Sequence, residues 1–185
     1  MTDPESDRHR EALKRVAVAL KDMGVAFALA GGYAAWVHGA PESAHDVDFV
    51  IEPADAPRVA AALRDGGFDV TQPAEDWLFK LDVDGADVDV LHRAVDGDLP
   101  GLLARAEELE VLSVRMPVMS ATDVVIEKMG AMDEHYCDFG QVLPVVRALR
   151  EQVDWDVVRD RVGGRPFADA FLFLLDRLDV VGADA

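Results

Sequence analysis

Two aspartates separated by one residue stand at the start of an expected strand. Asp46 and Asp48 open the segment 46–51, with sequence DVDFVI. Because alternate side chains of a strand point to the same face, these two project together while Val47 and Phe49 lie opposite. Two carboxylates about 7 Å apart repel each other unless a cation lies between them. A divalent ion with oxygen ligands, such as Mg²⁺, would satisfy the pair. A solvated strand end is the alternative.

A hairpin further along the chain carries more aspartates. Apolar residues alternate with charged ones over 78–83 and 86–92, and the Asp84-Gly85 pair between them is a favoured two-residue turn. Such a turn fixes the cross-strand pairing, so one face of the hairpin is apolar and the other is charged. The apolar, core-facing set is Phe79, Leu81, Val83, Ala86, Val88 and Val90; the other face carries Lys80, Asp82, Asp87, Asp89 and Leu91.

Asp89 is the hairpin residue best placed to join Asp46 and Asp48. Asp87 lies near the turn, where water screens its carboxylate, whereas Asp89 lies further into the sheet with Lys80 opposite it. We therefore expect Asp89 to complete a site of three carboxylates, with Asp87 as the second choice. A wholly solvated hairpin face is the alternative.

A glycine pair precedes the first two aspartates. Gly31 and Gly32 follow a short apolar strand at 25–30 and lead into a compact helix at 32–39. Glycines at a strand-to-helix junction let backbone N–H groups approach a phosphate, although a tight turn explains them equally well. The order carries the information: strand, Gly-Gly, short helix, Asp-x-Asp strand, then a later strand with one more aspartate.

The elements around these residues predict an α+β protein. Helices are expected at 4–23, 54–67 and 99–109, and short strands at 68–70 and, at the sheet edge, 111–116. Stripes of apolar residues at helical spacing follow in the C-terminal part of the chain. The first stripe begins after a capping box formed by Ser120 and Asp123. We expect a mixed β-sheet flanked by helices over residues 1–116 and a helical C-terminal lobe over residues 117–185.

The bulk composition restricts the class of protein. The chain has 185 residues, half of them hydrophobic, which suits one domain with a small lobe. No apolar run is long enough for a membrane span, and the charged N-terminus does not resemble a secretory signal. A single cysteine, Cys137, excludes an internal disulfide, so a cytoplasmic location is expected. The net charge of −18 argues against generic nucleic-acid binding.

In this order, the motifs resemble those of the polymerase-β-like nucleotidyltransferase superfamily. Its mark is a Gly-Gly or Gly-Ser turn, then Asp-x-Asp or Asp-x-Glu, then a third acidic residue on a following strand. The resemblance covers residues 25–92 and is greatest to the small bacterial branch, which includes AbiEii-type toxins, minimal nucleotidyltransferases of toxin–antitoxin pairs, and lincosamide and aminoglycoside nucleotidyltransferases. A looser likeness extends over residues 119–139, where Lys128 and Asp138 occupy the places of a family lysine and aspartate.

The resemblance implies transfer of a nucleoside monophosphate from an NTP to a hydroxyl of a small molecule, a protein or an RNA, with release of pyrophosphate. Asp46 and Asp48 would bind Mg²⁺, or Mn²⁺, carrying the triphosphate. Asp89 would complete a second metal site or act as the base that deprotonates the acceptor. The remaining residues expected to contact the nucleotide are Gly31, Gly32, Ser43 and Lys128.

The sequence departs from the family pattern at three places, one of them at residues 133–137, DEHYC, which replace a basic residue that often precedes the equivalent of Asp138. Gly32 stands where many relatives have serine, and residues 42–45, ESAH, replace an Arg-x-Thr motif and leave Ser43 as the available hydroxyl. The alternative to an active enzyme is therefore a non-catalytic relative that acts as a nucleotide sensor or in a toxin–antitoxin pair. A cognate antitoxin or toxin is an expected partner besides the NTP.

Overall fold

The structure of the chain, a computed structural model, describes residues 4–181. Its strands are β1 (Phe27–Ala30), β2 (Val47–Ile51), β3 (Asp69–Thr71), β4 (Leu78–Val83), β5 (Ala86–Leu91), β6 (Glu107–Val111) and β7 (Val114–Val118). The helices among them are α1 (Pro4–Asp22), α2 (Gly31–Val37), the short 3₁₀ helix η1 (Pro53–Asp55), α3 (Ala56–Asp65) and α4 (Leu99–Ala104). The helices that follow the last strand are α5 (Ala121–Gly130), α6 (Phe139–Leu149), α7 (Trp155–Val162) and α8 (Pro166–Arg177).

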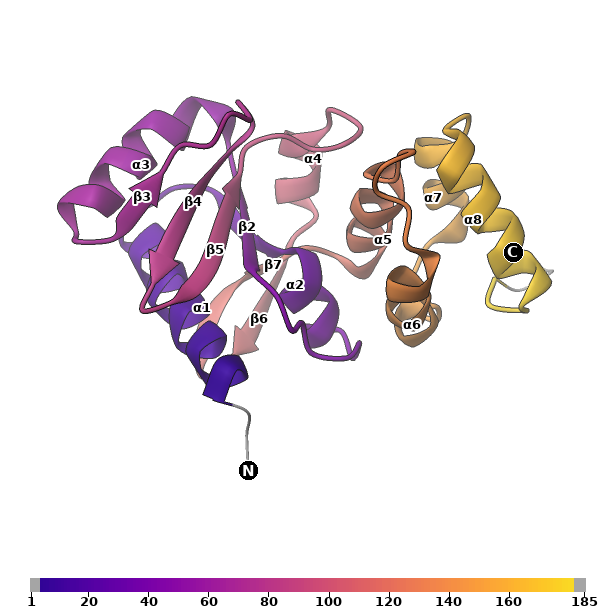
Figure 1. The fold of residues 1–185 in the computed structure, drawn as a ribbon, viewed down its shortest axis with the longest axis horizontal. Coiled ribbons are helices and arrows are strands. Elements are labelled where there is room, and N and C mark those ends of the chain that lie inside the picture. Colours follow the sequence, from indigo (N-terminus) through magenta and orange to yellow (C-terminus); the bar gives the residue numbers. More distant parts are fainter. Residues whose placement is uncertain (1–3, 182–185) are drawn as a thin grey trace.

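The architecture is α+β, as the sequence predicts. The sheet, with α1 and α3, occupies one end of the molecule, and α5 to α8 occupy the other (Figure 1). Within residues 4–181, every helix is too short or too polar to traverse a lipid bilayer. The last strand ends at Val118, close to the expected division between residues 116 and 117; that division into a core and a lobe stays a prediction.

The sheet is mixed, and its strand order brings the aspartate-bearing segments together. The order is β3-β4-β5-β2-β1-β7-β6. The pairs β2–β5 and β1–β7 are parallel, and the other neighbours are antiparallel. In the parallel β2–β5 pair, Asp48 lies opposite Asp89. Two segments 41 positions apart in sequence are thus adjacent at the centre of the sheet.

The β4–β5 hairpin has the predicted register. Val83 pairs with Ala86, and Lys80 pairs with Asp89. Asp84 and Gly85 both have positive φ, 55° and 82°, as a two-residue turn between right-twisted strands requires. The predicted apolar face is buried. Alternation and turn chemistry therefore sufficed to define this hairpin.

A second hairpin corrects two predictions. The expected helix 99–109 ends at Ala104, and its last residues belong to the edge strand β6. Within the expected edge strand 111–116, residue 111 ends β6, residues 112–113 form a turn, and residues 114–116 begin β7, an interior strand between β1 and β6. Leu112 and Ser113 form the turn with φ of 51° and 67°. Neither residue type signals such a turn, because side chains rarely adopt this conformation.

The helices cover the sheet with their apolar faces. Leu13, Val16 and Leu20 of α1 are fully buried, and α1 lies against β2, β5 and β7. The short helix α2 packs on β1 and β2 on one side and on α5 on the other. This places α5 beside the end of β1, where the Gly-Gly pair begins α2.

Ion pairs join the sheet to the helical lobe. Arg161 of α7 donates to Asp96 at 2.9 Å and to Asp98 at 2.8 Å, both in the segment that follows β5. Arg105 donates to the buried Asp123 of α5 at 2.7 Å. Charge-assisted bonds with buried carboxylates are short and directional. The lobe is therefore anchored to the strand that carries Asp89.

Glu127 of α5 belongs to the same junction. Its carboxylate accepts the Val95 N–H at 3.1 and 3.2 Å, and Arg165 donates to the Val95 carbonyl at 2.7 Å. Burial and the nearby Asp96 and Asp123 carboxylates raise the pKa of Glu127 to about 7, although the Val95 N–H opposes this.

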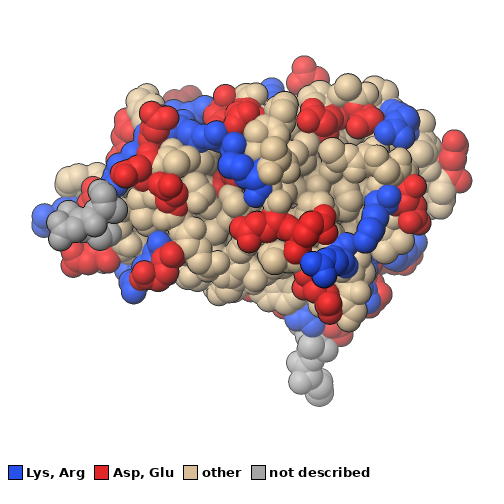
Figure 2. Space-filling model, turned by 180° about the vertical axis from the view of Figure 1, so that it is seen from behind, with Lys and Arg blue, Asp and Glu red and all other residues tan. Residues whose placement is uncertain are grey.

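Charged side chains of both signs are interspersed on the surface seen from behind in Figure 2, with uncharged surface between them. The net charge of −18 is thus not gathered into one acidic field on that face.

Replacing Glu127 by Gln is expected to raise the melting temperature at pH 8 and leave it nearly unchanged at pH 5. The folded-state pKa, about 7, exceeds the ordinary 4.5, so the folded protein binds this proton more tightly than the unfolded chain does. Stability from this group therefore falls as the pH rises from about 4.5 to above 7. Gln keeps an acceptor for Val95, and the gain at pH 8 should be about 1 kcal/mol.

Thermal melts at both pH values measure this gain. Glu134→Gln is the matched control, because its side chain is 77% exposed. Equal gains in the two variants, or a Glu127→Gln gain that is the same at pH 5 and pH 8, would contradict the assignment.

Candidate active site

Three carboxylates converge at the edge where β1 ends and β2 begins. Asp46, Asp48 and Asp89 each offer a carboxylate oxygen, and these oxygens all lie within 4.8 Å of one another. Val47 and Val88 project from the opposite faces of β2 and β5, and both are fully buried. A one-residue slip of either strand would exchange its acidic and apolar faces, so burial of the valines fixes where the carboxylates point.

The convergence is electrostatically costly for Asp48. Burial, together with the charges of Asp46 and Asp89, raises its pKa to about 7. The Lys128 ammonium and the Gly32 N–H, which donates to the carboxylate, act in the opposite direction. Carboxylate oxygens are the ligands that Mg²⁺ prefers, and a divalent ion would relieve the repulsion. The donor set therefore fits a divalent cation.

The predicted glycines lie directly against predicted site residues. Gly31 has φ of +56°, and a Cβ there would overlap the Asp48 carboxylate. A Cβ on Gly32 would come within 2.7 Å of the Ser43 Oγ. Both positions thus require glycine for close approach, and the first also for its left-handed conformation.

Lys80 forms an ion pair with the third carboxylate. Its Nζ donates to both oxygens of Asp89, at 2.8 and 2.7 Å. The Asp89 side chain is 12% exposed and that of Lys80 is 48% exposed, so the ammonium reaches the carboxylate from the solvent side. Burial raises the pKa of Asp89, and the bonds from Lys80 oppose that rise.

The loop that carries Ser43 is tied to α1 by a contact that the sequence did not reveal. Arg10 donates to the two carboxylate oxygens of Glu42 at 2.8 and 2.7 Å, and its guanidinium lies 5.6 Å from the centre of the Trp36 ring. The Ser43 Oγ accepts the His45 N–H at 3.3 Å. A pair 32 residues apart leaves no local pattern, so only the fold identifies it.

The two residues from the looser likeness have different surroundings. Lys128, in the last turn of α5, lies near enough to Asp48 to favour its ionised form. Asp138 instead caps α6, where it accepts the Gln141 N–H at 3.2 Å. The described contacts thus connect Lys128, but not Asp138, with the carboxylates.

A cavity of about 260 Å³ adjoins the site. Asp46 and Asp87 line it together with His45 and the buried His9, whose Nδ1 has no hydrogen-bond partner among the described residues. Asp87, the second choice for the third carboxylate, therefore faces this cavity, whereas Asp89 lies with Asp46 and Asp48.

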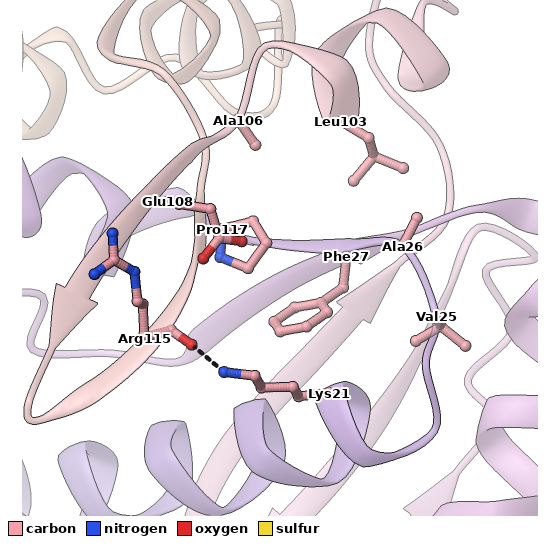
Figure 3. Close-up of a pocket in the computed structure, with 9 residues that line it drawn as sticks. All are labelled: Lys21, Val25, Ala26, Phe27, Leu103, Ala106, Glu108, Arg115 and Pro117. Atoms are coloured by element: carbon pink, nitrogen blue, oxygen red, sulfur yellow. Dashed lines mark hydrogen bonds between the residues drawn. The ribbon is translucent and has the colours of Figure 1, made fainter.

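A second cavity, of about 360 Å³, lies at the other end of β1. Phe27 and Pro117 form part of its wall, and the Lys21 Nζ donates to the Arg115 carbonyl at 3.1 Å beside it (Figure 3). The predicted site residues do not line this cavity. The chemistry expected from the sequence therefore belongs to the opposite end of the strand.

The sequence as a whole matches one family of proteins. Residues 5–180 fit the model of a family described as uncharacterised nucleotidyltransferases. The chain belongs to this nucleotidyltransferase family. Among curated proteins none matches the sequence. The match spans both the carboxylate strands and the helical lobe.

Solved structures share the fold of this nucleotidyltransferase. ANT(2″)-Ia in complex with adenylyl-2″-tobramycin has a TM-score of 0.58 at 10% identity, over 89% of this chain and 97% of that one. The lincosamide antibiotic adenylyltransferase LnuA, bound to lincomycin, has a TM-score of 0.56 at 14% identity, over 77% of this chain and 97% of that one. A nucleotidyltransferase-like protein from Paracoccidioides brasiliensis has a TM-score of 0.54 at 12% identity, over 94% of this chain and 89% of that one.

These likenesses concern the fold. They confirm the predicted polymerase-β-like nucleotidyltransferase fold, a mixed sheet with a helical C-terminal part. The narrower resemblance to AbiEii-type and toxin–antitoxin members stays a prediction, as does the cytoplasmic location.

Replacing Asp48 by Asn is expected to stabilise the nucleotidyltransferase at pH 8 in the presence of a chelator, by about 1–2 kcal/mol. The change removes a carboxylate whose charge is disfavoured by burial and by two neighbours, while the amide oxygen still accepts the Gly32 N–H. Mg²⁺ should raise the melting temperature of the wild type and not that of the variant.

Thermal melts with and without Mg²⁺ measure both effects. Asp82→Asn is the matched control, because Asp82 is an exposed aspartate near the turn of the β4–β5 hairpin, outside the carboxylate cluster. A chelated Asp48→Asn protein less stable than the wild type would contradict this account.

Proposed function

We propose that this nucleotidyltransferase transfers a nucleoside monophosphate from an NTP to a hydroxyl acceptor in a reaction that requires a divalent metal ion. The observation that carries the proposal is the meeting of three carboxylate oxygens within 4.8 Å beside Gly31. Family membership supports the reaction class, and the three carboxylates form the site at which we propose that the reaction occurs. A non-catalytic sensor is less favoured, because all three carboxylates are retained and mutually oriented.

Each site residue has a proposed role. Asp46 and Asp48 hold Mg²⁺ or Mn²⁺, which neutralises charge on the triphosphate and activates the α-phosphorus when bound. Asp89 takes the proton of the acceptor hydroxyl, or contributes to a second metal site. The acceptor oxygen forms a bond to the α-phosphorus as the bond to pyrophosphate breaks.

The remaining residues bind the phosphates. Gly31 and Gly32 provide backbone without side chains at the site, which lets phosphate oxygens come close. The Ser43 hydroxyl supplies a hydrogen bond, and its loop is held by Arg10 and Glu42. Lys128 supplies positive charge near Asp48.

A small hydroxyl-bearing molecule is the acceptor class we favour. The net charge of −18 opposes the approach of an RNA backbone. Two structures that share the fold were solved with adenylyl-2″-tobramycin and with lincomycin. A protein or RNA acceptor stays a prediction, which the labelling assay below addresses. A toxin–antitoxin partner also stays a prediction.

The test is transfer of label. The protein is incubated with each α-³²P-labelled NTP, Mg²⁺ and a cell extract separated into small-molecule, protein and RNA fractions. Wild-type protein should label one fraction, Asp46→Ala should reduce the rate by at least 10²-fold, and Asp82→Asn should retain it. Label that persists with Asp46→Ala would contradict the proposal.

Calorimetry separates binding from transfer. Each of the four NTPs is titrated into the protein with Mg²⁺ and, in parallel, with a chelator. We expect at least one NTP to bind only with Mg²⁺. If no NTP shows Mg²⁺-dependent binding, the non-catalytic alternative becomes the better description.

A further inference from the structure

We infer that Lys80 takes the place of a second divalent ion at Asp89, so that the site holds one divalent ion and not two. The inference rests on the proposed function and specifies its metal site. It also decides between the two roles proposed for Asp89, because an Asp89 neutralised by Lys80 does not complete a second metal site.

The geometry of the pair is that of a neutralised carboxylate. The Lys80 Nζ lies 2.8 and 2.7 Å from the two oxygens of Asp89. The two residues face each other across the β4–β5 ladder, so the ammonium is delivered by a rigid strand and not by a loop. A carboxylate has about four lone-pair positions, and two of those on Asp89 are used by this cation.

A second ion would have to share those oxygens with the ammonium. Divalent ions of this class bind carboxylate oxygens at about 2.1 Å. An ion on Asp89 would thus lie roughly 5 Å or less from the Lys80 nitrogen that binds the same group. The Asp89 side chain is 12% exposed and that of Lys80 is 48% exposed, so water screens only part of their repulsion.

The distribution of charge around the cluster agrees with a single ion. Lys80 faces Asp89, and Lys128 acts on Asp48 from α5. Asp87 also acts on Asp89, so four carboxylates and two lysines leave an excess of two negative charges, which one divalent ion matches. Lys80 also fixes the plane of the Asp89 carboxylate, which makes it a positioning residue for that group.

The experiment counts bound Mn²⁺ directly, without turnover. Mn²⁺ is titrated into the full chain, alone and with one equivalent of an α,β-methylene NTP analogue, for each of the four bases in turn, and free Mn²⁺ is measured by electron paramagnetic resonance. We expect one Mn²⁺ per chain for the wild type and two for Lys80→Met. Lys80→Arg keeps the cation and should bind one.

Two controls keep the count interpretable. Lys14→Met removes a lysine that pairs with Glu11 on α1 and should bind one Mn²⁺, like the wild type. Thermal melts verify that each variant is folded; the 48% exposure of the Lys80 side chain favours this. Should Lys80→Met not fold, Lys80→Gln replaces it with the same expectation of two ions.

The outcomes separate this inference from the proposed function. Two Mn²⁺ per wild-type chain, or one per folded Lys80→Met or Lys80→Gln chain, would overturn the role of Lys80 and leave a metal-dependent enzyme in place. No Mn²⁺ bound by any variant, with or without nucleotide, would overturn the proposed metal site itself and this inference with it.

Discussion

The parallel pairing of β2 with β5 is the constraint on which the rest of the site depends. It sets Asp48 beside Asp89, while Val47 and Val88 on the reverse faces are fully buried. Burial of the apolar faces opposes separation of the carboxylates, because either strand would have to expose its valine to turn its aspartate away. Folding therefore maintains a repulsive cluster that an isolated strand would not keep.

The neighbouring residues compensate for that repulsion in different ways. Gly31 gives the Asp48 carboxylate room that a side chain would fill, and the Gly32 N–H donates to it. Lys80 neutralises Asp89 from the solvent side. Such compensation is partial, since the pKa of Asp48 still rises to about 7. The residual repulsion favours binding of a cation, because a bound cation would relieve it.

The helical lobe contributes to the site through α5. The ion pairs of Arg161 with Asp96 and Asp98 hold the segment after β5 against the lobe. Glu127, which precedes Lys128 on α5, accepts a hydrogen bond from the same segment. The strand that supplies Asp89 and the helix that supplies Lys128 are thus joined by hydrogen bonds outside the site. The family match also extends over both parts, residues 5–180.

The sequence by itself determined the β4–β5 hairpin and the motif order that indicates the fold, because alternation and an Asp-Gly turn are local signals. It failed over 105–116, where an Ala- and Glu-rich run resembles a helix and the Leu112-Ser113 turn has no glycine. Only the tertiary structure decided that Asp89, not Asp87, lies with Asp46 and Asp48, and that Arg10 binds Glu42. Those relations depend on which strands become neighbours, and local sequence does not encode contacts between segments that are distant in the chain.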